Sequence, residues 1–167
     1  GFTMVERLLG AGADANAAQT SGLTPLMTAA RTGNLAIVRT FLDHGADVNA
    51  ATVETSSTAL MWALAAPHPD IVRLLLDRGA TPAMSTHVGF TPLMFAARNG
   101  DIEMAEALIA AGVDVNDTGA DGTHVLPFAI ISGRDRFALF LLEQGADPHG
   151  RMGGVSALHA AAGGVGM

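Results

Sequence analysis

Cysteine is absent from this chain of 167 residues. Its absence excludes disulfide bonds, thiolate nucleophiles and thiolate metal ligands. The longest uncharged apolar run, residues 59–67, is too short to cross a membrane. No basic stretch followed by an apolar run marks a signal peptide at the N-terminus. We therefore expect a soluble protein with no membrane insertion, and the residues leave open whether it is cytoplasmic or exported.

Lysine is absent as well. All nine basic residues are arginine, and 16 residues are acidic, so the formal net charge is −7. Phosphate binding requires a clustered basic face, and an acidic chain of this kind disfavours nucleic acid as a partner. The exclusive use of arginine indicates a GC-rich source genome, and we expect a bacterial one.

An internal repeat dominates the sequence. The string Gly89–Asp101 is nearly repeated as Gly22–Asn34. Its anchoring leucine recurs in steps of 34, 33, 33 and 32 residues, at Leu26, Leu60, Leu93, Leu126 and Leu158. A second string of the Gly-Ala-Asp type keeps the same spacing, from Gly12 to Asp147. Two strings in step at about 33 residues predict a stacked repeat, and an apolar share of 49% suffices for one domain with a continuous core.

Each repeat predicts two short helices. Thr24 and Thr91 are suitable N-caps, and the prolines that follow them suit the first helical position. The first, inner helices are expected at residues 25–31, 59–65, 92–98, 125–131 and 157–162. The second, outer helices are expected at residues 2–9, 35–43, 69–77, 102–110 and 135–143. Because helices of about nine residues are marginal alone in water, their stability must come from packing on neighbouring repeats.

The Thr-Pro-Leu-x-x-Ala-Ala-x-x-Gly and Leu-Leu-x-x-Gly-Ala-Asp-x-Asn strings resemble the ankyrin-repeat family over almost the whole chain. The resemblance implies an all-α ankyrin-repeat solenoid of stacked helix-turn-helix repeats with β-hairpin-like finger loops, in a single domain over residues 1–167. Its repeats are expected at 20–53, 54–86, 87–119 and 120–151, between partial repeats at 1–19 and 152–167. Because repeat arrays need polar caps and both outermost repeats are partial, we expect a fragment of a longer protein.

Three departures from the family pattern predict local differences. Pro67 and Pro69 predict a rigid link between the helices of repeat three, which cannot follow the usual turn. Pro127 and an extra residue before it predict a distorted start of the inner helix in repeat five. Methionine stands at Met27, Met61 and Met94 where the family usually has histidine, which is kept only as His159. We expect these methionines to serve as flexible packing.

The resemblance implies that a protein partner binds in a concave groove formed by the finger tips and the inner helices. Carried over position by position, the candidate partner-binding residues are Leu23, Arg31, Glu54, Ser57, His87, Val88, Phe90, Arg98, Asn99 and Ile131. Phe90 beside Arg98 is typical of an interface hot spot, and the alternative is that Phe90 folds back on its own finger. Trp62 is predicted to lie in the core, between Leu60 and Ala63.

No catalytic, cofactor or metal site is predicted. No two histidines have the i, i+4 spacing of a helical zinc site. Residues 114–119 match part of a calcium loop, but Val125 stands where that loop needs Glu, and the repeat already explains the match. The sequence thus predicts a protein–protein interaction scaffold rather than an enzyme. The alternative is a structural spacer or assembly arm within a larger, possibly exported, multidomain protein. The oligomeric state is expected to be a monomer or a weak end-to-end self-association.

Overall fold

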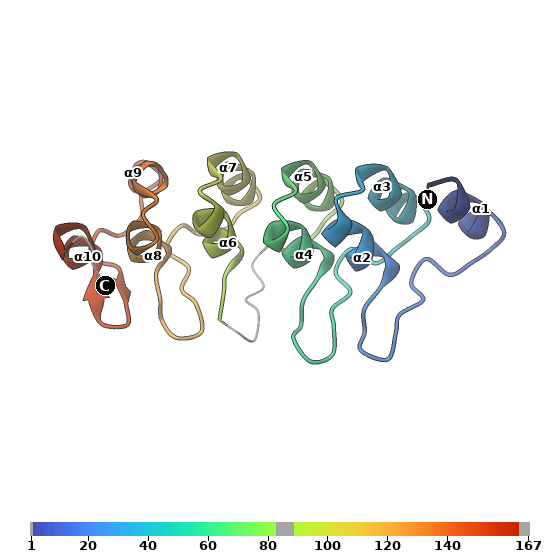
Figure 1. Cartoon of the computed structure of the whole chain (residues 1–167), viewed down its shortest axis with the longest axis horizontal. Helices are drawn as coiled ribbons and strands as arrows, with labels where there is room; N and C mark the ends of the chain where they lie inside the picture. Colours follow the sequence, from blue (N-terminus) through green and yellow to red (C-terminus); the bar gives the residue numbers. More distant parts are fainter. Residues whose placement is uncertain (1, 83–88, 164–167) are drawn as a thin grey trace. The chain divides into compact units, whose positions relative to one another are not determined.

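The computed structural model describes residues 2–82 and 89–163, which form two compact units, Gly1–Thr81 and Pro82–Met167 (Figure 1). The first unit begins with a lone outer helix, α1 (Phe2–Gly10). Two inner–outer helix pairs follow it in chain order. They are α2 (Pro25–Thr32) with α3 (Leu35–Asp43), and α4 (Ala59–Ala65) with α5 (Pro69–Asp77).

The second unit repeats the same arrangement. Its pairs are α6 (Pro92–Asn99) with α7 (Ile102–Ala110), and α8 (Val125–Ile131) with α9 (Asp135–Glu143). A short hairpin of β1 (Arg151–Met152) and β2 (Val155–Ser156) then leads to the inner helix α10 (Ala157–Gly163). Every predicted helix is present within one residue of its expected ends. In the described part of the chain, no helix combines the length and apolar character needed to cross a membrane.

Among the described residues, the loops that precede inner helices are hairpin-like, as predicted. In the last of them β1 pairs antiparallel with β2, with Arg151 opposite Ser156. Two earlier loops close through isolated antiparallel bridges, Ala51 with Thr58 and Thr118 with His124. We refer to these loops as the fingers.

A threonine cap fixes the start of three inner helices. Its hydroxyl accepts a hydrogen bond from the backbone N–H three residues on, at 3.3–3.4 Å, in the pairs Thr24–Met27, Thr58–Met61 and Thr91–Met94. In repeat five the cap residue is His124, which makes no such side-chain bond. The residue three positions on is Pro127, which has no N–H to satisfy. Helix α8 still begins directly before Leu126, like its counterparts, so the predicted distortion of this start is wrong.

The residue after the anchoring leucine also contributes to the cap. Met27 is buried, and its sulfur accepts a hydrogen bond from the Thr24 N–H at 3.5 Å, so this methionine adds a polar contact to the predicted packing. In the last repeat the equivalent residue is His159. Its Nδ1 lies 2.6 Å from the Ser156 hydroxyl.

The turn between the helices of repeat three differs from the others, as the two prolines predict. Gly33 and Gly100 end their inner helices with φ of 76° and 71°, in the left-handed region that favours glycine. In repeat three Pro67 stands at this position, and its ring excludes a positive φ. The His68 ring fills the space beside Gly33, with its Nε2 3.3 Å from the Arg31 carbonyl oxygen. A side chain at position 33 would therefore collide with this ring as well as strain the backbone.

The core of each unit lies between helices and is built from the repeated positions. The anchoring leucines that are almost completely buried are Leu26, Leu60, Leu93 and Leu126. Small residues one turn later bring the inner helices close together, and Ala30, Ala63 and Ala97 have no exposed surface. The outer helices add Val72, Leu75, Ala105 and Leu108 to this layer.

An asparagine bridge links successive repeats beneath the outer helices. The Asn49 amide donates to the Gly79 carbonyl at 3.0 Å, and its oxygen accepts from the Thr81 N–H at 2.8 Å. Asn16 and Asn116 make the same pair of bonds to the repeat that follows each of them.

We expect Asn49→Ala to lower the free energy of unfolding by about 1–2 kcal/mol, because two hydrogen bonds to the next repeat are lost and their backbone partners stay in place. Urea unfolding followed by circular dichroism measures the change. Asn34→Ala, which removes a helix cap within one repeat, serves as the comparison. Equal stability of Asn49→Ala and the wild-type protein would contradict a role of this bridge in stability.

Candidate binding surface

In the first unit, Arg31 and Trp62 form the main contact on the inner-helix surface. The guanidinium carbon of Arg31, on α2, lies 5.2 Å from the ring centroid of Trp62, on α4. This cation–π contact joins two successive repeats. Arg31 is exposed, and it contacts no carboxylate in the described part of the chain.

Trp62 is half-buried, so its predicted place in the core is wrong. Leu60 and Ala63 are buried, but a residue two positions after the anchoring leucine points to another side of a helix with 3.6 residues per turn. The indole Nε1 is itself shielded from solvent, and it has no hydrogen-bond partner among residues 2–82 and 89–163. The ring therefore presents an apolar, half-covered face beside a guanidinium.

The fingers of the first unit pack side by side. The Val53 N–H donates to the Ser21 carbonyl at 2.9 Å, and Gly22 approaches the Ala51 backbone so closely that a side chain there would be crowded. At the tip of its finger Val53 is 72% exposed, next to the exposed Glu54. Two other predicted contact residues, Leu23 and Ser57, are half-buried, and Ser57 bonds within its own finger.

In the second unit, three phenylalanines form a cluster that joins a finger to two inner helices. The Phe90 ring centroid lies 5.5 Å from that of Phe95 on α6 and 5.5 Å from that of Phe128 on α8. All three rings are half-buried. Phe90 thus packs on the helix of its own repeat and on that of the next, and it keeps part of its surface exposed.

One arginine borders this cluster, and a second contacts the backbone of the first. The Arg98 guanidinium carbon lies 5.2 Å from the Phe95 centroid, and the Arg134 Nε donates to the Arg98 carbonyl at 3.2 Å. Both arginines are exposed, and Arg98 contacts no carboxylate among the residues that the structure describes. Asn99 and Ile131, also predicted as contact residues, are half-buried at the ends of α6 and α8. The predicted His87 and Val88 lie outside the described residues.

The aromatic residues on the inner helices occupy the same position in their repeats, a pattern that the sequence prediction missed. Two residues after the anchoring leucine, three consecutive repeats carry Trp62, Phe95 and Phe128. The first repeat has Thr28 at this position and the last has Ala160. A comparison of the repeats at this position would have revealed the aromatic residues, because positions that do not serve the core are free to vary with function.

A carboxylate closes the finger of repeat five. Asp121 accepts a hydrogen bond from the Thr123 backbone N–H at 2.9 Å and another from the Thr123 hydroxyl at 2.9 Å. The backbone bond, followed by the hydroxyl bond, lowers the pKa of Asp121 below its ordinary value of 3.8. Ser21 occupies the same place in the first complete finger, where its hydroxyl accepts from the Leu23 N–H at 3.4 Å.

No group of three or more His, Asp or Glu side chains suited to a metal ion occurs among the described residues. In the partial calcium-loop match, Asp114 accepts from the Asn116 N–H at 2.8 Å, and Asn116 bridges to the next repeat. These oxygens therefore already have structural partners.

Comparison with known proteins identifies the repeat. A protein-family model described as ankyrin repeats (3 copies) matches residues 1–86 and 82–152 of this chain. The ankyrin repeat, SAM and basic leucine zipper domain-containing protein 1 of Dasypus novemcinctus is 37% identical over 118 residues, which are 68% of this chain and 24% of that protein. The ankyrin repeat and KH domain-containing protein mask of Drosophila melanogaster is 49% identical over 74 residues, which are 44% of this chain and 2% of that protein. Both relatives are animal proteins, so the expected bacterial source is not supported.

We expect Arg31→Ala to lower the free energy of unfolding by about 0.5–1 kcal/mol, the usual range of an exposed cation–π contact. The emission of Trp62, the single tryptophan, should shift to longer wavelength because water reaches the uncovered ring. Steady-state fluorescence and urea unfolding measure the two effects. Arg39→Ala on α3 is the matched control, and identical emission in all three proteins would contradict the contact.

The lowered pKa of Asp121 predicts a pH dependence. A carboxyl group with a lower pKa in the folded state stabilises the fold above its unfolded pKa, and this stabilisation is lost as the pH falls through the folded value. Below pH 3.8 the wild-type protein should therefore lose stability more steeply than Asp121→Asn. The urea midpoint between pH 5 and the acid range tests this, with Asp117→Asn as control. Parallel curves for wild type and Asp121→Asn would contradict it.

Proposed function

The chain belongs to the ankyrin-repeat family, and we propose that it binds a protein partner through the face formed by its finger tips and inner helices. Ankyrin repeats are in general protein–protein interaction modules rather than enzymes, and we assign no catalytic residue. The observation that carries the proposal is the cluster of Phe90, Phe95 and Phe128 with Arg98 at its edge.

The cluster has the composition of an interface hot spot. Aromatic residues and arginine are enriched where a few side chains supply most of the binding free energy. Each ring is already held by its neighbours, so it loses little conformational freedom when a partner binds. A partner side chain that covers the rings would remove their remaining apolar surface from water, which is favourable by about 25 cal/mol per Å².

The charges favour a partner segment that is acidic as well as apolar. Arg98 lies beside the rings and Arg134 contacts the Arg98 backbone, in a chain whose net charge is −7. Stacking on Phe95 covers one face of the Arg98 guanidinium and leaves its N–H edge available to a carboxylate. Arg31 on Trp62 offers a similar combination in the first unit. Complementary charge of this kind selects partners and speeds their association.

The second candidate function is a structural spacer or assembly arm in a larger protein. It is favoured by the relatives, because this chain spans 24% of the Dasypus novemcinctus protein and 2% of the Drosophila melanogaster protein. As a spacer, the chain would connect other parts of that protein without using the face formed by its finger tips and inner helices. The two functions thus differ in whether substitutions on that face matter.

We expect a phage-displayed library of random peptides, selected on the immobilised protein, to yield peptides that combine apolar and acidic residues. Their affinity, measured by isothermal titration calorimetry, should fall at least about tenfold in Arg98→Glu, since the substitution reverses the charge that borders the aromatic cluster. The matched control is Arg136→Glu on the outer helix α9, which should bind like the wild-type protein.

Circular dichroism and thermal unfolding of both variants verify that the fold is intact. Failure to enrich any peptide, or peptides that bind Arg98→Glu and the wild-type protein equally well, would contradict the proposed binding face and support the spacer. If the selected peptides are apolar but contain no acidic residue, and their affinity still depends on Phe90, the result would support the binding face and contradict an acidic partner.

A further inference from the structure

Position 62 differs chemically from the equivalent position in the two repeats that follow. Repeat three carries Trp62 two residues after its anchoring leucine, whereas repeats four and five carry Phe95 and Phe128. All three rings are half-buried on inner helices. Of the three side chains, only that of Trp62 has a hydrogen-bond donor. The indole N–H therefore distinguishes the ring of the first unit from those of the second.

The Trp62 indole N–H has no acceptor in the described part of the chain. Its Nε1 is shielded from solvent and makes no hydrogen bond there. A shielded donor without an acceptor destabilises a fold, and a phenylalanine at the same position avoids this cost. Phe95 and Phe128 show that a phenylalanine ring fits an inner helix at this position. Packing alone therefore does not explain the tryptophan.

A cation held beside the ring also lacks a partner of opposite charge. The Arg31 guanidinium carbon lies 5.2 Å from the Trp62 ring centroid, and none of the described carboxylates contacts this arginine. The Arg31 backbone is held by repeat three as well, because the His68 Nε2 lies 3.3 Å from the Arg31 carbonyl oxygen. These two contacts place the N–H edge of the guanidinium next to the indole before any partner binds.

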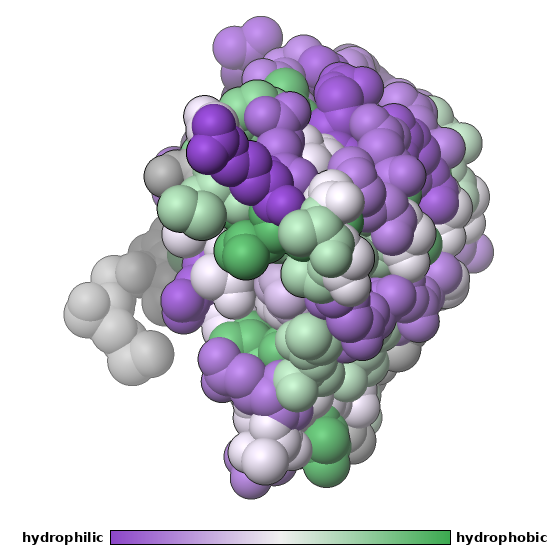
Figure 2. Space-filling view, turned by 90° about the vertical axis from the view of Figure 1, so that its right-hand side faces the viewer, coloured by the Kyte–Doolittle hydropathy of each residue, from purple (hydrophilic) through white to green (hydrophobic). Residues whose placement is uncertain are grey.

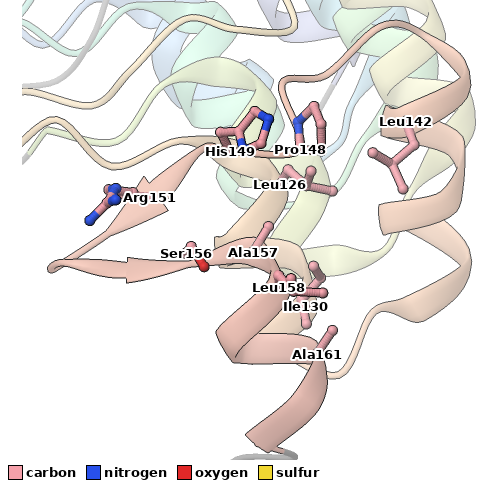
Figure 3. A pocket seen from close by; sticks show the side chains of 10 residues that line it. All are labelled: Leu126, Ile130, Leu142, Pro148, His149, Arg151, Ser156, Ala157, Leu158 and Ala161. Atoms are coloured by element: carbon pink, nitrogen blue, oxygen red, sulfur yellow. The ribbon is translucent and has the colours of Figure 1, made fainter.

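Two larger apolar surfaces in the described chain have no comparable polar group without a partner. Figure 2 looks onto the end of the first unit that carries α1, where hydrophobic patches interrupt a hydrophilic surface and Met4 and Leu8 are exposed. In the second unit, a hollow of about 400 Å³ beside α10 is lined by residues that include Leu142 and Leu158 (Figure 3). Within the chain a neighbouring repeat covers the equivalent surfaces, so exposure alone does not mark a binding site there.

We propose that Arg31 and Trp62 form a subsite for a carboxylate side chain, aspartate or glutamate, of the protein partner. The inference rests on the proposed function, and it adds an acid-binding subsite in the first unit to that of Arg98 in the second. The edge of the Arg31 guanidinium donates to the carboxylate. The indole turns about its Cβ–Cγ bond, which brings Nε1 to the same carboxylate and places ring carbon atoms on the shielded side.

The subsite distinguishes an acid from its amide. A carboxylate has two oxygens that accept from the guanidinium and from the indole N–H at once, and its charge strengthens both bonds. An amide has one acceptor oxygen and no charge, so it satisfies only one of the two donors fully. The partner residue at this subsite is therefore aspartate or glutamate rather than asparagine or glutamine.

Selection of a phage-displayed library of random peptides on the Arg98→Glu protein tests the proposal. The three-ring cluster offers more apolar surface than Trp62 alone, so peptides selected on the wild-type protein occupy the cluster first. Reversing the Arg98 charge weakens that site and leaves the subsite of the first unit intact. We expect the selected peptides to contain aspartate or glutamate. Their binding should shift the emission of Trp62, the single tryptophan.

Further substitutions in the Arg98→Glu protein assign the contacts. Peptide affinity, measured by isothermal titration calorimetry, should fall at least about tenfold when Arg31→Ala or Trp62→Phe is added, because each removes a hydrogen bond to a charged group. Trp62→Phe keeps a ring at this position, so Arg31 still has an aromatic face to pack on. Arg39→Ala on the outer helix α3 is the matched control and should leave the affinity unchanged. Circular dichroism verifies the fold of each variant.

A double-mutant cycle connects the peptide to Arg31. Changing the acidic residue of the peptide to its amide should weaken binding to the Arg98→Glu protein at least about tenfold. The same change should have little effect once Arg31→Ala is present, because the charge that pairs with the acid is gone.

Peptides that are enriched on the wild-type protein but not on Arg98→Glu would overturn the subsite and leave the proposed binding face of the second unit in place. Binding that survives Arg31→Ala or Trp62→Phe would overturn the subsite as well, since both side chains are assigned to the carboxylate. Enrichment on neither protein would contradict the subsite together with the proposed function.

Discussion

The burial of one leucine per repeat depends on the helices of its own repeat and of its neighbours. A pair of helices this short is not stable alone, and its apolar faces are covered only when other helices pack on them. Leu60 lies within such a stack and has 1% of its surface exposed, whereas Leu158 lies at the end of one and has 75% exposed. The burial of this leucine therefore depends on whether another repeat packs on its helix.

Polar contacts repeat in step with this apolar layer and give the stack its register. Asn16, Asn49 and Asn116 each bond to two backbone groups of the repeat that follows. Hydrogen bonds have narrow distance and angle limits, so they fix the offset between repeats more sharply than apolar contact does. A rigid offset in turn holds residues of successive repeats at constant spacing, as a preorganised binding face requires.

The candidate binding surface depends on the constant offset between successive repeats. Because core and cap positions are committed to stacking, the position two residues after the anchoring leucine is available to vary. Trp62, Phe95 and Phe128 occupy this position. Arg31 contacts the Trp62 ring, and Arg98 contacts the Phe95 ring. The contacts that build this surface also join repeats, since Arg31 reaches Trp62 from the preceding repeat and Phe90 touches the helix of the following one. A partner that binds these residues also reinforces the contact between repeats.

The amino-acid sequence by itself determined the period, which is visible as two strings that recur in step. It also determined the helix boundaries and most of the caps, because these depend on residues within three or four positions of one another. Thr24 with Met27 is such a local pair, and the left-handed turn at Gly33 is another local feature. Even where the local prediction was wrong, at Pro127, the reason lies in a single missing N–H three residues from the cap.

Only the tertiary structure decided which side chains share the surface. Arg31 and Trp62, or Phe90 and Phe128, are more than 30 positions apart in the sequence and meet only because the repeats stack with a particular offset. The half-burial of Trp62 and the exposure of Leu158 likewise depend on which neighbour packs against each helix. A periodic sequence marks equivalent positions, but the burial of each position depends on contacts with other repeats, which the period alone does not contain.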